Sequence, residues 1–236
     1  MWLAIETSTK QMGVAVVDGE RLLSSYELLA DYPHAVELPD AVKRVLKAAG
    51  ITLDQLSGIA VDIGPGSFTG LRIGLAFAKA LLYGRKTRLA GVPSMDVLAA
   101  NLPFHSGLIC VLLDARQKNV YGALYRVQGG EAARQGEIYL GPPDEFLARI
   151  KEPAVVLGDG AAIYREAVLK RCPAAQFAAP ELWLPRAAIL ARLGQARAAA
   201  GQVDDPATLV PLYLYPMDCS VRGPNRPTAI LAQPAA

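Results

Sequence analysis

The chain has 236 residues, of which 52% are hydrophobic and 19% are charged, and its formal net charge is +2. This length is enough for two small domains or one large one, and so apolar a composition favours a well-packed protein with apolar surface left over for a partner. The small net charge does not indicate a nucleic-acid-binding protein, because affinity for phosphates comes from many clustered Lys and Arg residues.

The first 104 residues predict a lobe in which a β-meander is followed by alternating helices and strands. Asp18 and Gly19 form the hairpin turn of the meander, since both residues tolerate positive φ. Apolar residues at helical spacing, followed by Gly50, predict the first helix. The predicted elements are strands at 2–5, 13–17 and 21–28, a helix at 38–49, a strand at 58–63, a helix at 71–83, a strand at 88–92 and a helix from 93 to about 100.

Residues 105–204 predict a second lobe that partly repeats the first. Its predicted elements are strands at 108–113, 119–127 and 154–157 and helices at 144–150, 161–171 and 186–200. Alternation of strands and helices is typical of an α/β protein with mixed sheets. The sequence leaves open whether the last helix packs back on the first lobe. The Pro-rich tail at 205–236 is expected to be extended.

The most informative segment is a glycine-rich loop between the strand at 58–63 and the helix at 71–83. Its glycines permit backbone shapes that a Cβ would block, and Ser67 or Thr69 can cap the helix. A loop that ends at a helix N-terminus is also a candidate phosphate site, but the lysine of the Walker pattern is missing. The pattern favours a tight turn with a cap over a phosphate site. The candidate loop residues are Gly64, Pro65, Gly66, Ser67, Thr69, Gly70 and Arg72.

The helix predicted at 71–83 is apolar nearly all round, apart from one narrow stripe that contains Arg72 and Lys79. A helix of this kind is usually buried on more than one side. The sheet can cover one side, and the other needs either a second helix of this chain or another subunit. The pattern alone does not decide between an ordinary core helix and an interface helix.

The segment from Gly64 to Gly74 resembles the hallmark of the TsaB family, also called YeaZ. The opening residues 3–9 are similar to the start of that family, and residues 113–121 resemble its second marker. His34, with the Glu-Leu-Pro sequence that follows it at 37–39, resembles the entry to its first helix. The resemblance covers roughly the first half of the chain well.

The resemblance implies an actin-like (ASKHA, sugar kinase/Hsp70-type) α/β fold of two related lobes with mixed β-sheets flanked by helices. It also implies a TsaD-like catalytic subunit and a TsaE-like ATPase as partners, and a homodimer when the catalytic subunit is absent. Such complexes transfer a threonylcarbamoyl group to the adenosine next to the anticodon, so that tRNA is contacted through the complex. In the family, the first two helices of each subunit make the contact. The matching residues here are Leu38, Val42, Val45, Leu71, Gly74, Leu75, Ala78 and Leu82.

The resemblance further implies the positions at which related enzymes hold a metal ion and the phosphates of ATP. The residues of this chain at those positions do not support either site. The catalytic relative holds a metal with two histidines four residues apart, whereas this chain has only His34 and His105. ATP-using members of the fold cradle phosphates with an acidic turn that contains glycine in each lobe, and neither turn of this chain contains glycine. We therefore expect Glu6, Thr7 and Asp114 to be remnants of a nucleotide site with structural roles.

These expectations describe a non-catalytic subunit with no metal and no tightly bound cofactor, in a complex whose ATP and metal are held by the partner subunits. A stand-alone ATP-dependent kinase or ATPase of the same fold is an alternative, and it would depend on Glu6 and Asp114. A peptidase, the older label of the wider family, is another alternative, although Ser67 lacks the sequence frame of a nucleophile elbow.

The three cysteines are widely spaced and predict neither a disulfide framework nor a CxxC metal site, which favours a reducing cytoplasm. No basic stretch leads into an apolar run at the N-terminus, so a signal peptide is not expected. The apolar run at 71–83 is too short to span a bilayer, and no membrane contact is expected.

Overall fold

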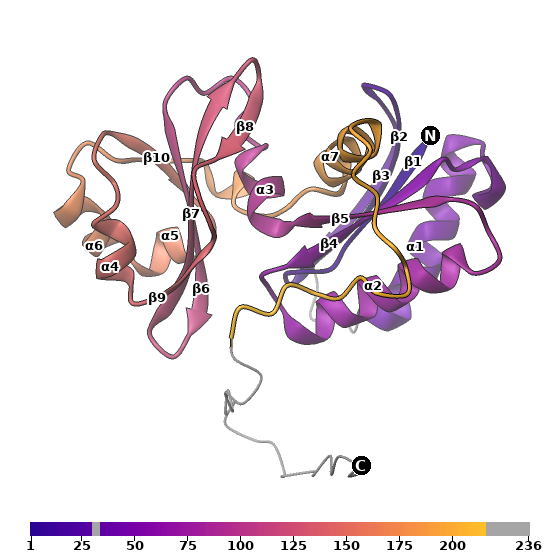
Figure 1. Cartoon of the computed structure of the whole chain (residues 1–236), viewed down its shortest axis with the longest axis horizontal. Coiled ribbons are helices and arrows are strands. Elements are labelled where there is room, and N and C mark those ends of the chain that lie inside the picture. Colours follow the sequence, from indigo (N-terminus) through magenta and orange to yellow (C-terminus); the bar gives the residue numbers. More distant parts are fainter. Residues whose placement is uncertain (30–33, 216–236) are drawn as a thin grey trace, which may run out of the picture.

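The computed structural model describes residues 1–29 and 34–215, which form two lobes that lie side by side (Figure 1). Each lobe contains a sheet of mixed strand direction with helices on its faces. The last helix, α7 (Ala187–Ala199), returns to the first lobe after the chain has completed the second (Figure 1).

The sheet of the first lobe consists of β1 (Trp2–Glu6), β2 (Gln11–Asp18), β3 (Arg21–Leu29), β4 (Gly58–Gly64) and β5 (Arg88–Pro93). Their order is β3-β2-β1-β4-β5. β1 pairs antiparallel with β2 and parallel with β4. Every residue of β1 is buried, because the strand lies in the middle of the sheet and is covered on both faces.

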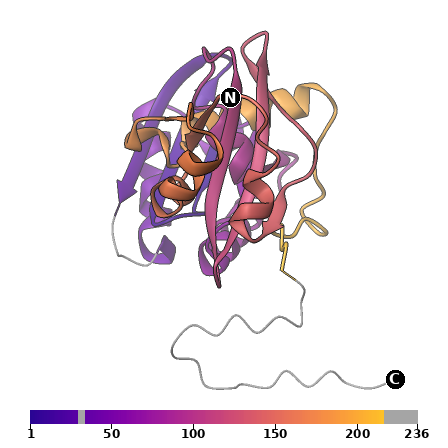
Figure 2. The ribbon, with the colours of Figure 1, turned by 90° about the vertical axis from the view of Figure 1, so that its left-hand side faces the viewer.

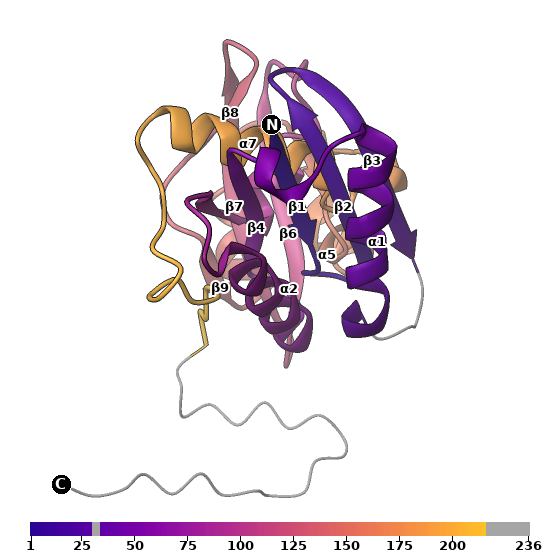
Figure 3. The same ribbon diagram turned by 90° about the vertical axis from the view of Figure 1, so that its right-hand side faces the viewer.

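Helices cover both faces of this sheet: α1 (His34–Ala49) and α2 (Phe68–Leu82) lie on one face and α7 on the other (Figures 1 and 3). Leu3 and Ile5 of β1 join the core under α1 and α2, whereas Ala4 joins the core under α7. Small residues bring α7 close to the sheet, since a Cβ at Gly194 would overlap that of Ala60. The first lobe therefore has two separate apolar layers.

The second lobe repeats this arrangement with β6 (Leu108–Arg116), β7 (Asn119–Gln128), β8 (Glu131–Arg134), β10 (Ala154–Leu157) and β11 (Gln176–Phe177), while β9 (Tyr139–Gly141) pairs with β7. The order is β11-β10-β6-β7-β8. β6 pairs antiparallel with β7 and parallel with β10, as β1 does with β2 and β4. The equal order and sense of pairing confirm the predicted fold of two related lobes.

One face of the second sheet is covered by α4 (Pro143–Leu147), α5 (Gly160–Ile163) and α6 (Arg165–Arg171). The other face is covered by α3 (Ser94–Ala99), whose Met95 and Leu98 pack with Ile109 and Val111 of β6. α3 thus connects the two lobes. Figure 2 shows the second lobe from the side that faces away from the first lobe. Two short 3-10 helices complete the chain, η1 (Leu53–Gln55) and η2 (Pro180–Leu182).

Several elements differ from the predictions. α1 begins at His34, so that Pro39 lies in its second turn and removes one hydrogen bond without ending the helix. α2 begins at Phe68 instead of residue 71. The helix predicted at 161–171 is two helices that meet at Tyr164. The last helix packs on the first lobe, the arrangement that the sequence left open. No helix among residues 1–29 and 34–215 is long and apolar enough to cross a membrane.

Candidate functional site

The glycine-rich loop at 64–70 and the polar turn at 6–9 lie next to each other, because they follow the neighbouring parallel strands β4 and β1. The amide of Ser67 donates to the carbonyl oxygen of Ser8 at 2.7 Å. Thr7 Oγ1 donates to the carbonyl oxygen of Gly70 at 2.9 Å. The loop is therefore fastened to the turn at two points.

Glycine is required where the loop and the turn touch. A Cβ at Gly66 would overlap the carbonyl oxygen of Ser8, and a Cβ at Gly70 would overlap that of Thr7. One helical turn further on, a Cβ at Gly74 would overlap Thr7 Oγ1. Three glycines of the motif are thus explained by close approach of the chain to itself. This supports the interpretation as a tight turn over the interpretation as a phosphate site.

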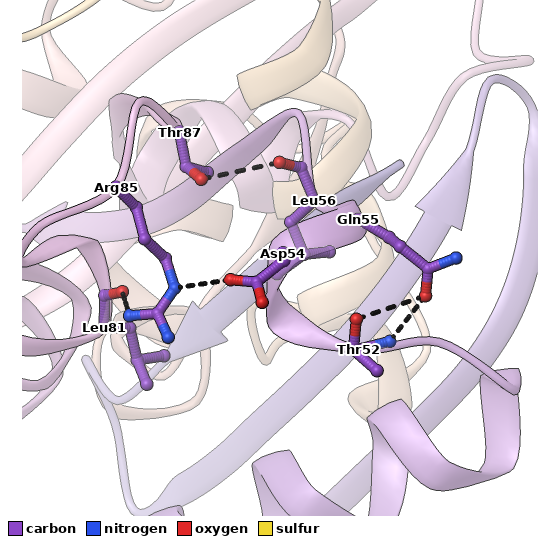
Figure 4. Close-up of polar contacts among 7 residues, drawn as sticks. All are labelled: Thr52, Asp54, Gln55, Leu56, Leu81, Arg85 and Thr87. Carbon is purple, nitrogen blue, oxygen red and sulfur yellow. Dashed lines mark hydrogen bonds and ion pairs between the residues drawn. The ribbon is translucent and has the colours of Figure 1, made fainter.

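Both ends of α2 are held by side chains. Ser67, one of the two predicted caps, accepts a hydrogen bond from the amide of Gly70 at 3.2 Å. At the other end, Arg85 Nε donates to Asp54 Oδ1 at 3.1 Å and Arg85 Nη1 donates to the carbonyl oxygen of Leu81 at 2.9 Å (Figure 4). Asp54 belongs to η1, which leads into β4. The end of α2 is therefore tied to the 3-10 helix that precedes β4.

The other predicted loop residues take different positions. Pro65 is buried, whereas Thr69 is exposed. Arg72 points away from the turn: its guanidinium lies 4.3 Å from the ring centroid of Phe68, and its Nε donates to the hydroxyl of Tyr213 at 3.1 Å. Arg72 therefore contacts the C-terminal segment of the chain and not the turn at 6–9.

Two carboxyl groups, those of Glu6 and Asp62, meet in the interior of the first lobe, where both residues are fully buried. Glu6 Oε1 accepts hydrogen bonds from the amide and the hydroxyl of Ser8, at 2.7 and 2.6 Å. Asp62 Oδ1 accepts from the amide of Gly64 at 2.7 Å and from the hydroxyl of Ser94 at 2.6 Å. The second oxygens, Glu6 Oε2 and Asp62 Oδ2, are buried and have no hydrogen-bond partner among the described residues.

Burial raises the pKa of Glu6 well above its usual range, and repulsion by Asp62 raises it further. Burial also raises the pKa of Asp62. The pair therefore keeps a proton at pH values where a carboxyl in water has lost it. Sequence reasoning found Glu6 but missed Asp62. The signal that could have revealed Asp62 is an acidic residue inside an otherwise apolar strand.

Asp114 lies at the end of β6 and is bound to its own hairpin. Its Oδ1 accepts from the amide of Arg116 at 3.0 Å, and its Oδ2 lies 3.4 Å from Arg116 Nη1. The amide of Asp114 donates to Asp159 Oδ1 at 2.9 Å. Residues 116–118 all have positive φ, between 50° and 65°, which is strained for side chains other than glycine. Asp114 thus contacts the strained turn of its own hairpin.

The eight residues that were expected to contact a partner are buried inside the first lobe, so this expectation is wrong for them. Leu38 and Ala78 have no exposed surface, and Leu75 and Leu82 are only 5% exposed. The reason is that α1 and α2 turn their longest apolar rows toward the sheet that they cover. The corrected residues are Leu38, Val42, Val45, Leu71, Gly74, Leu75, Ala78 and Leu82.

α2 nevertheless has a second apolar side. Ala76 and Ala80 are exposed, and Ile73 and Phe77 are half-buried at the margin of the core. We call these four residues the α2 face. The neighbouring helix α1, which lies beside α2 in Figure 3, exposes three cations, Lys43, Arg44 and Lys47.

Comparison with known proteins assigns the chain to a family. Residues 28–204 match the family model described as TsaD, tRNA N6-adenosine threonylcarbamoyltransferase. The tRNA threonylcarbamoyladenosine biosynthesis protein TsaB of Bacillus subtilis is 31% identical over 216 residues, which are 90% of this chain and 93% of that protein. The chain belongs to the TsaB (YeaZ) family. The solved structure of YeaZ from Pseudomonas aeruginosa is similar, with a TM-score of 0.78 and 28% identity over 90% of this chain and 99% of that one.

This chain is also similar to a transferase. The tRNA N6-adenosine threonylcarbamoyltransferase of Geobacter sulfurreducens is 30% identical to this chain over 143 residues, which are 54% of the chain but only 42% of the transferase. The similarity therefore relates the chain to the transferase, and the matching region covers less than half of the transferase.

The two histidines of this TsaB-family chain lie in different places. His34 begins α1, and its Nε2 lies 2.9 Å from the carbonyl oxygen of Thr9. His105 lies between α3 and β6. In the part of the chain that the structure describes, no three His, Cys, Asp or Glu side chains come together in a way that would hold a metal ion.

Proposed function

We propose that the chain is a non-catalytic subunit of a complex that makes N6-threonylcarbamoyladenosine at the adenosine next to the anticodon of tRNA, and that it binds and activates a TsaD-like catalytic subunit. One observation carries the proposal: α2 is fastened at both ends, yet the α2 face is apolar and accessible. A helix held in this way loses little conformational freedom when a partner binds, so more of the binding free energy is retained.

The groups that an enzyme would need are engaged by the chain itself. Glu6 is buried against Asp62, and Asp114 is bound to its hairpin, which weighs against a stand-alone kinase or ATPase. Ser67, the nucleophile that a peptidase would have to use, caps α2. These contacts favour a protein that acts by binding a partner.

The α2 face suits the side of another helix. Ala76 and Ala80 lie one turn apart and have small side chains, so that a second helix can approach closely between Ile73 and Phe77. The cations of α1 favour acidic residues on the part of the partner that faces them. A TsaD-like subunit is a natural partner, because its sequence is related to this chain and it therefore offers helices of the same fold.

Replacement of Ala76 by aspartate places a charge in the middle of the α2 face. We expect the variant to fold normally, since Ala76 is exposed, and to bind the TsaD-like subunit of the same organism on the order of 100-fold more weakly, because an unpaired charge is buried in the interface. Isothermal titration calorimetry measures the affinity. The rate of tRNA modification by the reconstituted partner set, with and without this chain, measures the activation.

Ala162→Asp is the matched control, because Ala162 is also an exposed alanine on a helix but lies in the second lobe. It should leave both the affinity and the modification unchanged. Unweakened binding by the Ala76→Asp variant would overturn the assignment of the α2 face. Modification at the full rate without this chain would overturn the proposed function.

The proposal extends to the rest of the complex. A TsaE-like ATPase joins it, tRNA is contacted through it, and its ATP and metal are held by the partner subunits. Without the catalytic subunit, the chain forms a homodimer through the α2 face. Analytical ultracentrifugation should then find a dimer of the wild type and a monomer of the Ala76→Asp variant. Calorimetry with ATP should find no tight binding by the isolated chain.

A further inference from the structure

The segment that follows α7 is attached to the first lobe at several points. The amide of Asp204 donates to the carbonyl oxygen of Leu89 at 2.9 Å, and Asp204 Oδ2 accepts from the amide of Gly91 at 2.8 Å, so the segment begins on the edge strand β5. Further on, the amide of Leu212 donates to the carbonyl oxygen of Ile63 at the end of β4, at 2.7 Å. The segment then reaches the N-terminal end of α2 (Figure 1).

Two tyrosines near the end of this segment contact different lobes. The ring of Tyr213 lies 5.3 Å from that of Phe68, and its hydroxyl accepts from Arg72, so Tyr213 is held by α2 of the first lobe. Tyr215 is held by the second lobe instead. Its hydroxyl donates to the carbonyl oxygen of Ala115 at 2.8 Å and accepts from Asn119 Nδ2 at 3.3 Å.

The ring of Tyr215 adds a third contact with the second lobe, edge-on to the ring of Tyr121 at 6.2 Å. All three contacts lie on the hairpin between β6 and β7. The chain therefore crosses from one lobe to the other within two residues. Between the lobes it forms a connection that is not part of either sheet.

The other two connections between the lobes lie together at a different place. They are the linker between α3 and β6 and the segment that leads from η2 to α7, and Asn101 Nδ2 joins them by donating to the carbonyl oxygens of Leu182 and Leu184, at 2.9 and 3.1 Å. The linker enters β6 at Leu108, whereas Tyr215 contacts Ala115 near the other end of the same strand. Along a strand this separation is about 23 Å.

We propose that residues 209–215 form a strap that holds the two lobes in a closed arrangement, with Tyr215 as its latch. A pair of adjacent connections at one end of β6 acts as a hinge and leaves the lobes free to rotate. A third attachment at the far end of β6 prevents that rotation. Release of Tyr215 frees the hairpin of the second lobe, while Leu212 and Tyr213 keep the strap on the first lobe.

A distance measurement between the lobes tests this proposal. Lys86 in the first lobe and Lys170 in the second are exposed, and both can be replaced by cysteine for spin labelling in the full-length chain with Cys219→Ser. Dilution with unlabelled chain restricts the signal to distances within one molecule. Tyr215→Ala removes all three latch contacts, and we expect the distance distribution to shift to longer values and to broaden.

Two hydroxyl deletions form the matched pair. Tyr215→Phe removes only the hydrogen bonds to the second lobe, and should shift the distribution in the same direction by a smaller amount. Tyr213→Phe loses a bond within the first lobe, and should leave the distribution unchanged. Circular dichroism checks that each variant is folded. If Tyr215→Ala does not fold, the distance distribution of Tyr215→Phe alone tests whether Tyr215 holds the lobes together. Identical distributions for the wild type and both Tyr215 variants, or an equal shift with Tyr213→Phe, would overturn the proposal.

Discussion

Glu6 and Asp62 hold a proton that neither carboxyl would keep in water, because burial raises the pKa of both. A raised pKa in the folded state means that the folded protein binds this proton more tightly than the unfolded chain. The resulting stabilisation is complete below the ordinary carboxyl pKa of about 4 and is lost as the pH rises toward the raised values. The folded state should therefore become less stable toward alkaline pH.

The variant Glu6→Gln tests this pH dependence. The glutamine oxygen can still accept from Ser8, and the glutamine side chain does not titrate. We expect the free energy of unfolding to fall between about pH 5 and about pH 8 in the wild type, and to fall less in the variant. Urea denaturation at both pH values measures it. Glu166→Gln, at an exposed position on α6, is the control and should retain the slope of the wild type.

Among the loop glycines at 64, 66 and 70, an added Cβ would come closest to a neighbouring atom at Gly70. The Cβ of alanine there would overlap the carbonyl oxygen of Thr7, a backbone atom that cannot move without disturbing the end of β1. We expect Gly70→Ala to lower the free energy of unfolding by about 1–3 kcal/mol. Thr69→Ala, at the exposed neighbouring position, should change it by less than about 0.5 kcal/mol. Equal effects of the two substitutions in urea denaturation would contradict the explanation of the loop glycines.

At the scale of the element, α2 shows what an apolar pattern does and does not determine. The sequence correctly predicts a helix with too much apolar surface for one sheet. It does not tell which row faces the sheet, because both rows have helical spacing. In the structure, the row that contains three leucines fills the core, and the row with two alanines stays accessible. The loop cap at Ser67 was predictable, since capping depends on local sequence alone.

Substitutions on opposite sides of α2 separate these two rows. Aspartate at Ala78 would bury a charge in the core, and we expect a loss of about 4 kcal/mol or more, enough to unfold a marginal protein. Aspartate at Ala76 should change the stability by less than about 1 kcal/mol. Urea denaturation followed by circular dichroism measures both. A stable Ala78→Asp variant would contradict the orientation of α2 in which Ala78 faces the core.

At the scale of the whole molecule, the sequence predicts the two lobes but not what joins them. The strands β8, β9 and β11 were missed, because they have only two to four residues and carry little periodic signal. The carboxyl pair was missed because Glu6 and Asp62 meet only through the pairing of β1 with β4, which no local pattern reveals. The contacts of Tyr213 and Tyr215 depend in the same way on the finished fold.

The position of α7 has a consequence for the order of events during synthesis on the ribosome. The strands β1 and β4 are among the first parts of the chain to emerge, but the helix that covers one of their faces is among the last. Until residue 199 has been made, Ala4 and Ala60 lack their apolar cover. The first lobe therefore cannot complete its core before the C-terminal part of the chain has been made. A nascent chain that stalls between the lobes exposes an uncovered apolar sheet face to chaperones.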